Sequence, residues 1–512
     1  MTRTRRIAGG AALGLANQVF AVVVGLWLTR FVLGRLGQHD YGLWLLGLQV
    51  AGYLALADVG VVAILPRQTA FAAGAPRGDA DDAALRDLTG ETTRVVLWQT
   101  PLVAAAGLVV WVLVPASWAA LRAPLAVVIL VFVAAFPLRV FPALLQGLQD
   151  LTFAAGVQFV GWALNAVLVV ALLLCDARLF ALAIAWAAAQ LVPPLLCLWR
   201  LRRRFPRVLP RGLPHLTWPA ARRQLARSTW VSVGQVAGIL VSGADILIVG
   251  ALLGPAAVVP YVLTGKLVTV LGNLPLLLAH TSGPALSEMR VAEAPHALGR
   301  ATTALTQAVL VGSGAVACVV LAANHGFVTW WVGAGQYGGP ALTVLFVVSM
   351  LVQHYGTTVV YAVYSFGHER LLALIGLAQG VVGVALSVVL VHIVGPAGAV
   401  LGVLAAAVAV TLPLALPVIA RDTGTTSLAL LRGLLPWAWR LCFLLGVGLT
   451  AGLVIRPRGA LAVAAVAGLA ALCYAAVAVP FALRPPLREY TLQVLRAVGD
   501  RLRRGSSPVG MA

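Results

Sequence analysis

The 512-residue chain is 61% apolar and 10% charged, whereas soluble globular domains carry about 25% charged residues. This composition excludes a soluble globular protein. The formal net charge of +20 would suit a nucleic-acid-binding protein, but the basic residues gather at the ends of apolar segments, so we expect no nucleic-acid partner.

The apolar residues form stretches of 20 residues or more, and about 20 helical residues cross a hydrocarbon core of about 30 Å. Because backbone groups in that core must hydrogen-bond internally, each stretch should be helical. The sequence therefore predicts an all-α integral membrane protein of about 14 transmembrane helices. The predicted spans, in chain order, are 10–33, 42–65, 94–116, 121–146, 153–174, 178–199, 228–253, 256–279, 300–324, 339–366, 370–394, 397–420, 432–455 and 459–483.

The basic residues assign a side of the membrane to each connection. Of the 36 Lys and Arg residues, 27 fall on one side of this topology and six on the other. Cytoplasmic connections carry the excess of Lys and Arg, so both termini should be cytoplasmic. The same cations are expected to meet anionic lipid headgroups.

An alkaline phosphatase reporter fused after residue 512 tests this topology. Because that enzyme folds only outside the cytoplasm, we expect no activity from the fusion, and full activity from one placed in the connection 325–338. An active C-terminal fusion would contradict the predicted fourteen-span topology.

A weak internal repeat divides the chain. Residues 17–37 align with 234–254 at an offset of 217, and Gly147 aligns with Gly367 at an offset of 220. Internal repeats are a feature of transporters, and six helices per repeat predict parallel repeats. The predicted domains are an N-terminal six-helix lobe with a basic cytoplasmic linker (1–227), a C-terminal six-helix lobe (228–424), two additional helices (425–483) and a basic cytoplasmic tail (484–512).

Three tracts, 33–70, 243–267 and 365–402, carry a family resemblance. They contain Leu36-Gly37, Tyr41-Gly42, Asp58-Val59-Gly60 and Arg67 with Ala70, then Asp245, Gly250, Gly254, Tyr261 and Lys266, then the glycine-rich tract from Ser365 to Gly402. With these motifs the chain resembles the Wzx-type polysaccharide flippases of the multidrug/oligosaccharidyl-lipid/polysaccharide exporter superfamily.

The resemblance implies two six-helix lobes around a central cavity, in a bacterial inner membrane. It further implies alternating access and a polyprenyl-pyrophosphate-linked oligosaccharide as cargo. A polysaccharide polymerase and glycosyltransferases are the expected protein partners.

Charged groups inside the spans are the candidate site, because each costs about 2.5–3.5 kcal/mol there and usually faces a cavity or a partner. Asp58 and Arg139 share a depth in the cytoplasmic half, and Asp245 and Lys266 share one in the outer half. Two interpretations stay open. Either these residues form two buried ion pairs that fix helix packing, or the cations bind pyrophosphate while an aspartate couples an ion.

Pro137 and Pro142 should kink the fourth span around Arg139. Arg30 and Arg67, near opposite faces, are further candidate cargo-binding cations, although snorkelling to the interface also explains them.

No catalytic constellation, cofactor motif or metal-ligand spacing is present in the sequence, and no Walker motif. The sequence therefore predicts a transporter and not an enzyme, with no cofactor. The alternatives are a lipid II flippase or a multidrug/cation antiporter of the same superfamily, and, in another class, a membrane glycosyltransferase.

Overall fold

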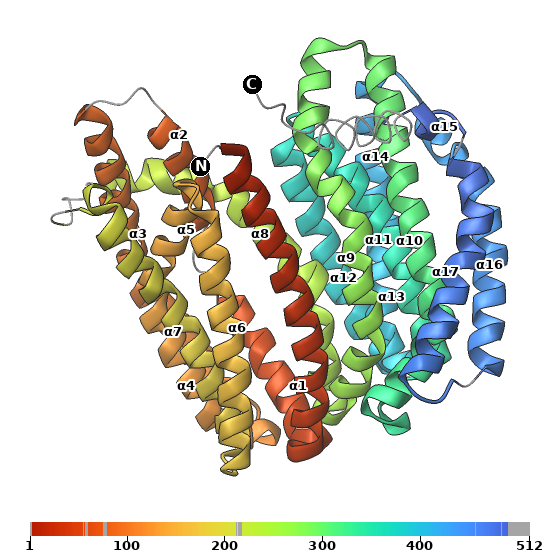
Figure 1. Ribbon diagram of the computed structural model, residues 1–512, viewed down its shortest axis with the longest axis horizontal. Helices are drawn as coiled ribbons and strands as arrows, with labels where there is room; N and C mark the ends of the chain where they lie inside the picture. Colours follow the sequence, from red (N-terminus) through yellow and green to blue (C-terminus); the bar gives the residue numbers. More distant parts are fainter. Residues whose placement is uncertain are drawn as a thin grey trace, which may run out of the picture. The chain divides into compact units, whose positions relative to one another are not determined.

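The computed structural model describes residues 3–54, 56, 60–74, 79–210, 212, 218–455, 457–482 and 484–489. Every regular element over these residues is helical, and 13 helices are long and apolar enough to cross a membrane. The predicted all-α membrane fold is confirmed (Figure 1). Contacts divide the chain into a first unit, Met1–Val259, and a second unit, Pro260–Ala512.

The first two predicted spans differ from the observed helices. Helix α1 (Arg3–Leu54) joins two helices across a sharp turn at Gly37, whose φ of +77° is a conformation that glycine adopts without strain. Helix α2 (Val61–Gly74) begins inside the second predicted span, so a continuous helix over 42–65 is not observed. The number of candidate transmembrane helices is 13 because Asn17–Leu54 counts as one helix and α2 is too short to count as another.

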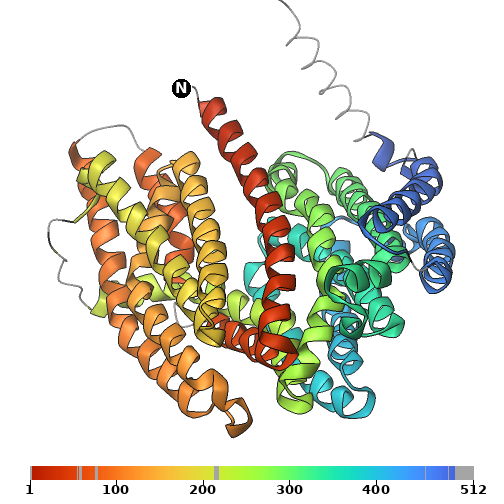
Figure 2. The same cartoon turned by 60° about the horizontal axis from the view of Figure 1, so that its bottom comes forward.

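Helices α3, α4, α6 and α7 of the first unit run side by side in two views (Figures 1 and 2). Helices α6 and α7 pack against each other, α4 packs against α7, and α2 packs against α5. At Gly147 of α5 an added Cβ would overlap Thr69 and the carbonyl of Pro66, so only glycine allows this approach to α2. The bounds are α3 (Asp79–Val112), α4 (Ala119–Ala135), α5 (Val140–Gly147), α6 (Leu151–Leu174), α7 (Arg178–Arg204) and α8 (Trp218–Leu253).

Helix α8 is assigned to the second lobe by the sequence repeat, but its contacts place it in the first unit, against α1 and α2. Gly250 of α8 lies directly against Leu46 of α1, and Gly42 lies against the carbonyl of Pro255. Small residues at these points let the helices approach closely. The predicted lobe boundaries stay a prediction.

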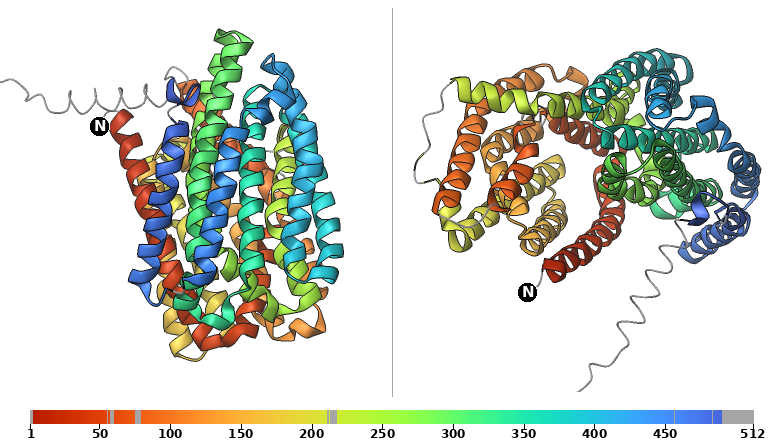
Figure 3. Two further views of the ribbon diagram at one scale, coloured as in Figure 1. Left: turned by 90° about the vertical axis from the view of Figure 1, so that its right-hand side faces the viewer. Right: turned by 90° about the horizontal axis from the view of Figure 1, so that it is seen from above.

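The second unit is built around α10, which packs against α11, α16 and α17. Trp437 Nε1 donates a 3.1 Å hydrogen bond to the Tyr474 hydroxyl, and the Tyr474 ring lies against Gly314 of α10. Figure 3 shows these helices from the side. The bounds are α9 (Pro255–Ala292), α10 (Pro295–Val332), α11 (Pro340–Ser365), α12 (Glu369–Val394), α13 (Ala397–Ala406), α14 (Leu412–Asp422), α15 (Ser427–Arg432), α16 (Leu435–Val454) and α17 (Ala460–Ala482).

Helices α9 and α10 are longer than a membrane is thick. Each has 38 residues, or about 57 Å at about 1.5 Å per residue, against about 40–45 Å for a bilayer with its headgroups. Their hairpin extends past the ends of the neighbouring helices of the second unit (Figures 1 and 3).

Turns with positive φ recur in the same order along the chain. Gly37 (+77°) and Gly254 (+89°) are 217 residues apart, and Gln149 (+61°) and Gly367 (+91°) are 218 apart. The first offset equals the 217 of the sequence repeat, and the second is two residues shorter than the 220 that separates Gly147 from Gly367. Superposition of 10–199 on 228–420 as parallel repeats stays a prediction.

Candidate functional site

The fourth predicted span is broken at Arg139. Helix α4 ends at Ala135, a 3-10 turn spans Phe136–Arg139, and α5 follows from Val140. Proline at the start of this turn removes a backbone donor, which explains why the break falls where the sequence predicted a kink. Arg139 is half-buried, with its guanidinium carbon 5.6 Å from the centre of the Phe136 ring. The break therefore holds a cation inside a span, against an aromatic face.

The other predicted cations of the first unit are exposed. Arg30 lies on α1, and Arg67 lies on α2 with its guanidinium carbon 5.6 Å from the Phe71 ring centre. Asp58 lies outside the described residues, so its pairing with Arg139 stays a prediction.

Asp245 has polar neighbours that sequence reasoning missed. It is half-buried on α8, and its charge acts on Tyr53 of α1. Two residues earlier, Gly243 lies so close to Gln49 that an added Cβ would overlap the Gln49 amide. Gln49 and Tyr53 are four residues apart and share a helix face. Two polar residues four apart within a predicted span were the sequence signal that could have indicated polar neighbours for Asp245.

Lys266 lies half-buried on α9 and belongs to the second unit, whereas Asp245 belongs to the first. Its helix is packed closely at the preceding residue, Gly265, which faces the Phe346 ring. The predicted pairing of Lys266 with Asp245 stays a prediction.

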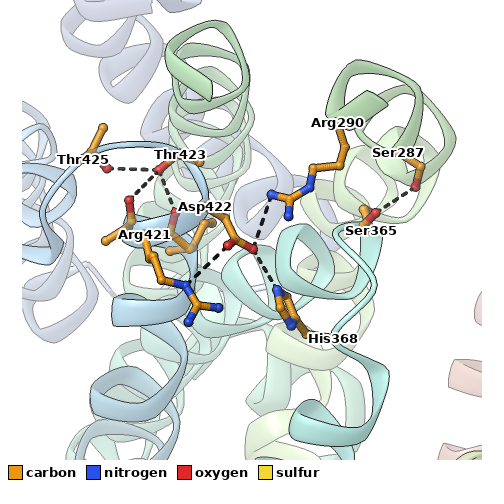
Figure 4. Close-up of polar contacts among 10 residues, drawn as sticks. Ser287, Arg290, Ser365, His368, Arg421, Asp422, Thr423 and Thr425 are labelled. Atoms are coloured by element: carbon orange, nitrogen blue, oxygen red, sulfur yellow. Dashed lines mark hydrogen bonds and ion pairs between the residues drawn. The ribbon is translucent and has the colours of Figure 1, made fainter. Parts of the chain in front are cut away.

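An ionic cluster joins three helix ends at the predicted cytoplasmic end of the second unit (Figure 4). The Asp422 carboxylate, only 7% exposed, lies 2.8 Å from His368 Nε2 and 3.4 Å from Arg290 Nη1. Arg290 also lies over the Phe366 ring, at 5.3 Å. Asp422 thus connects the end of α14 to α9 and to the turn before α12. Sequence reasoning missed this cluster, since these residues are far apart in the chain.

Replacing Asp422 by asparagine should destabilise the second unit by about 1–3 kcal/mol, because a hydrogen bond to a charged group contributes about that much. Thermal unfolding of the purified protein in detergent measures the change. Asp176→Asn is the matched control, since Asp176 is exposed on a turn. Equal unfolding temperatures for both variants would show that the cluster does not stabilise the unit.

The first unit has a corresponding ion pair of reversed sign. Arg200 Nε near the end of α7 lies 3.0 Å from Asp150 Oδ2, in the turn before α6. In the second unit the basic residue, His368, precedes α12 and the acid ends α14. Each unit thus ties the turn after its fourth predicted span to the end of its sixth.

Solved structures with a similar arrangement of helices are known. The lipid II flippase MurJ in its inward closed conformation matches with a TM-score of 0.66 and 9% identity, over 93% of this chain and 99% of that one. The chain has the fold of MurJ. An outward-facing multidrug resistance MATE family transporter of the MOP superfamily matches this chain with a TM-score of 0.52 and 13% identity, over 82% of this chain and 95% of that one.

The Vibrio cholerae MATE transporter VcmN in its bent form also matches, with a TM-score of 0.51 and 14% identity, over 82% of this chain and 98% of that one. No protein-family model matches the sequence, and no curated protein matches it. With identities of 9–14%, the likeness to MurJ and the MATE transporters is one of fold.

Proposed function

We propose that this protein is a flippase that moves a polyprenyl-pyrophosphate-linked oligosaccharide from the cytoplasmic to the outer leaflet by alternating access. Its product would supply a polymerase and glycosyltransferases of cell-surface polysaccharide biosynthesis in a bacterial inner membrane. The observation that carries the proposal is the fold shared with a lipid II flippase over 93% of the chain. The tracts that resemble Wzx-type flippases add support for an oligosaccharide as the cargo.

The length of the match favours a flippase over an antiporter. The MurJ match covers 93% of the chain and the MATE match 82%. The difference, about 56 residues of 512, is close in size to the segment from Leu435 to Ala482 that forms α16 and α17. A fourteen-helix flippase accounts for this segment, and a twelve-helix antiporter does not.

The proposed cargo carries a pyrophosphate, so cations are needed along its path. Arg139 and Lys266 are half-buried within spans, where a charge is costly unless it serves a cavity or a partner. The guanidinium fork of Arg139 can bind two phosphate oxygens at once, and Lys266 offers a point charge. Arg30 and Arg67 would receive the headgroup near the two faces. Asp245 would couple an ion or neutralise Lys266.

The membrane potential should accelerate this export. A potential that is negative inside favours outward movement of anions by about 2.3 kcal/mol per charge per 100 mV, or about 7 kcal/mol for a dianion at about 150 mV. In proteoliposomes that contain a fluorescent polyprenyl-pyrophosphate oligosaccharide, we expect transfer to slow at least tenfold when valinomycin and potassium collapse the potential. A rate that is independent of the potential would exclude this driving force.

Lipid II is the second candidate cargo, favoured by the TM-score of 0.66 to the lipid II flippase. Expression in two bacterial strains separates the candidates, one lacking its polysaccharide flippase and one depleted of its lipid II flippase. We expect rescue of surface polysaccharide in the first strain and no rescue of growth in the second. The reverse result would assign lipid II, and rescue of neither with normal membrane insertion would contradict the flippase proposal.

A further inference from the structure

A pocket of about 300 Å³ lies within the second unit, between α10, α11 and α16. Its wall is apolar (Leu321, Leu449, Leu453), and its other edge is polar (His325, Tyr337, Thr343). The connection between α10 and α11 contributes Tyr337, and Trp330, which is 41% exposed, stands just before it, as aromatic residues do at a membrane interface. The pocket therefore lies at the predicted outer interface.

The hydrogen-bond donors beside this pocket are already used. Asn324 is fully buried, and its Nδ2 donates to the Thr264 carbonyl at 3.0 Å and to Thr343 Oγ1 at 3.1 Å. Thr343 donates to the Gly339 carbonyl at 3.2 Å, so its oxygen accepts the Tyr337 hydroxyl at 3.0 Å. Burial raises the pKa of Tyr337, and its hydrogen bond with Thr343 lowers it by less, so the phenol keeps its proton at neutral pH.

Hydrogen-bond acceptors at the pocket remain without donors. The Nδ1 atom of His325, a residue that lines the pocket, is buried and has no hydrogen-bond partner. The Tyr337 oxygen keeps a lone pair after donating its proton. Buried polar atoms without partners are costly, and a ligand that brings donors would satisfy them.

The aromatic rings favour a cationic donor. The His325 and Tyr337 rings meet edge to face, with centroids 5.0 Å apart, and a ring face attracts ammonium groups. No lysine or arginine is among the residues that line the pocket. The chemistry therefore selects a protonated amine over a phosphate or a carboxylate.

The size and opening of the pocket indicate a lipid headgroup. A volume of 300 Å³ is about ten times the share of one water molecule in the liquid, enough for about ten non-hydrogen atoms and so for a phosphoethanolamine headgroup. The apolar wall includes Leu453, which is 53% exposed, and Val454 beside it is 81% exposed. The remaining hydrocarbon of a bound lipid can extend along this exposed apolar surface.

We propose that this pocket binds the primary ammonium headgroup of a membrane phospholipid such as phosphatidylethanolamine, with His325 and Tyr337 as acceptors. The site is separate from the cargo-binding cations and does not depend on the proposed flippase activity.

Native mass spectrometry of the full-length protein, titrated with single phospholipids, tests the proposal. We expect phosphatidylethanolamine to bind at least tenfold more tightly than phosphatidylcholine, whose trimethylated ammonium lacks N–H donors, and phosphatidylglycerol to bind no better than phosphatidylcholine. Leu453→Trp fills the pocket and should remove this preference. Leu461→Trp, at a position 88% exposed on α17, is the matched control and should retain it.

Tyr337→Phe keeps the ring but loses the oxygen, so it should reduce the preference without filling the pocket. Stabilisation of the wild type by phosphatidylethanolamine, read as a rise in unfolding temperature, gives a measurement that needs no variant. Equal binding of all three lipids, or an unchanged preference in Leu453→Trp, would overturn the proposal. Equal binding of phosphatidylethanolamine and phosphatidylcholine would also overturn it, because the N–H donors of the primary ammonium group would then make no difference.

Discussion

Gly402→Leu is expected to prevent correct folding of the second unit. Helices α12 and α13 touch through their backbones: an added Cβ on Gly402 would overlap Ser387, and one on Gly398 would overlap the backbone of Leu390. Small residues four apart permit such contact, and the Ser387 hydroxyl also donates to the Ala399 carbonyl at 3.0 Å. Overpacking costs about 1–3 kcal/mol where side chains can move. Because the added side chain would meet backbone atoms, we expect the free energy of unfolding to fall by about 3 kcal/mol or more.

Yield of folded protein and unfolding temperature, measured by size-exclusion chromatography after heating, report the effect. Gly446→Leu is the control, since Gly446 lies inside α16 and an added Cβ there meets nothing within 4 Å. A Gly402→Leu protein as stable as the Gly446→Leu protein would show that α12 and α13 separate without cost.

Arg139→Ala should reduce flipping about 10- to 100-fold while protein abundance stays near normal. A charge-assisted hydrogen bond to the cargo is worth about 1.5–3 kcal/mol, and the rate should fall by the corresponding factor. Arg139→Lys should restore only part of the activity, because a point charge replaces a two-pronged guanidinium. Transport of the fluorescent cargo in proteoliposomes, with equal amounts of protein, gives both rates.

A structural role for Arg139 predicts a different pattern. Arg139→Ala would then lower abundance, and the double variant Asp58→Ala/Arg139→Ala would recover both abundance and transport. That recovery would measure coupling between the two residues. It would exclude the cargo-binding role of Arg139.

Local chemistry made much of the fold predictable. Hydropathy located the spans because every crossing helix needs about 20 apolar residues, and prolines located the break at Arg139 because they remove a backbone donor. The second span, 42–65, was wrong as one helix. Hydropathy is insensitive to where a backbone turns, and α1 ends at Leu54 inside the stretch predicted as one span.

The polar neighbours of the site could not be predicted in the same way. Asp422 meets Arg290 and His368 across more than 50 residues of chain, and the acceptors around His325 depend on which hydroxyl donates to which carbonyl. Depth along a span, which the sequence gives, does not determine the face of the helix on which a residue lies. Contacts between helices supply that information.

The extended hairpin of α9 and α10 has a mechanical consequence. Arg290 stands in the last turn of α9, at the base of the hairpin tip, and is fastened to Asp422 at the end of α14 and to the Phe366 ring after α11. A force applied at the tip, where Val291 is 90% exposed, would be transmitted to three other helix ends together. A protein or antibody that binds the hairpin tip on the predicted cytoplasmic side would therefore act on this end of the second unit without entering the membrane.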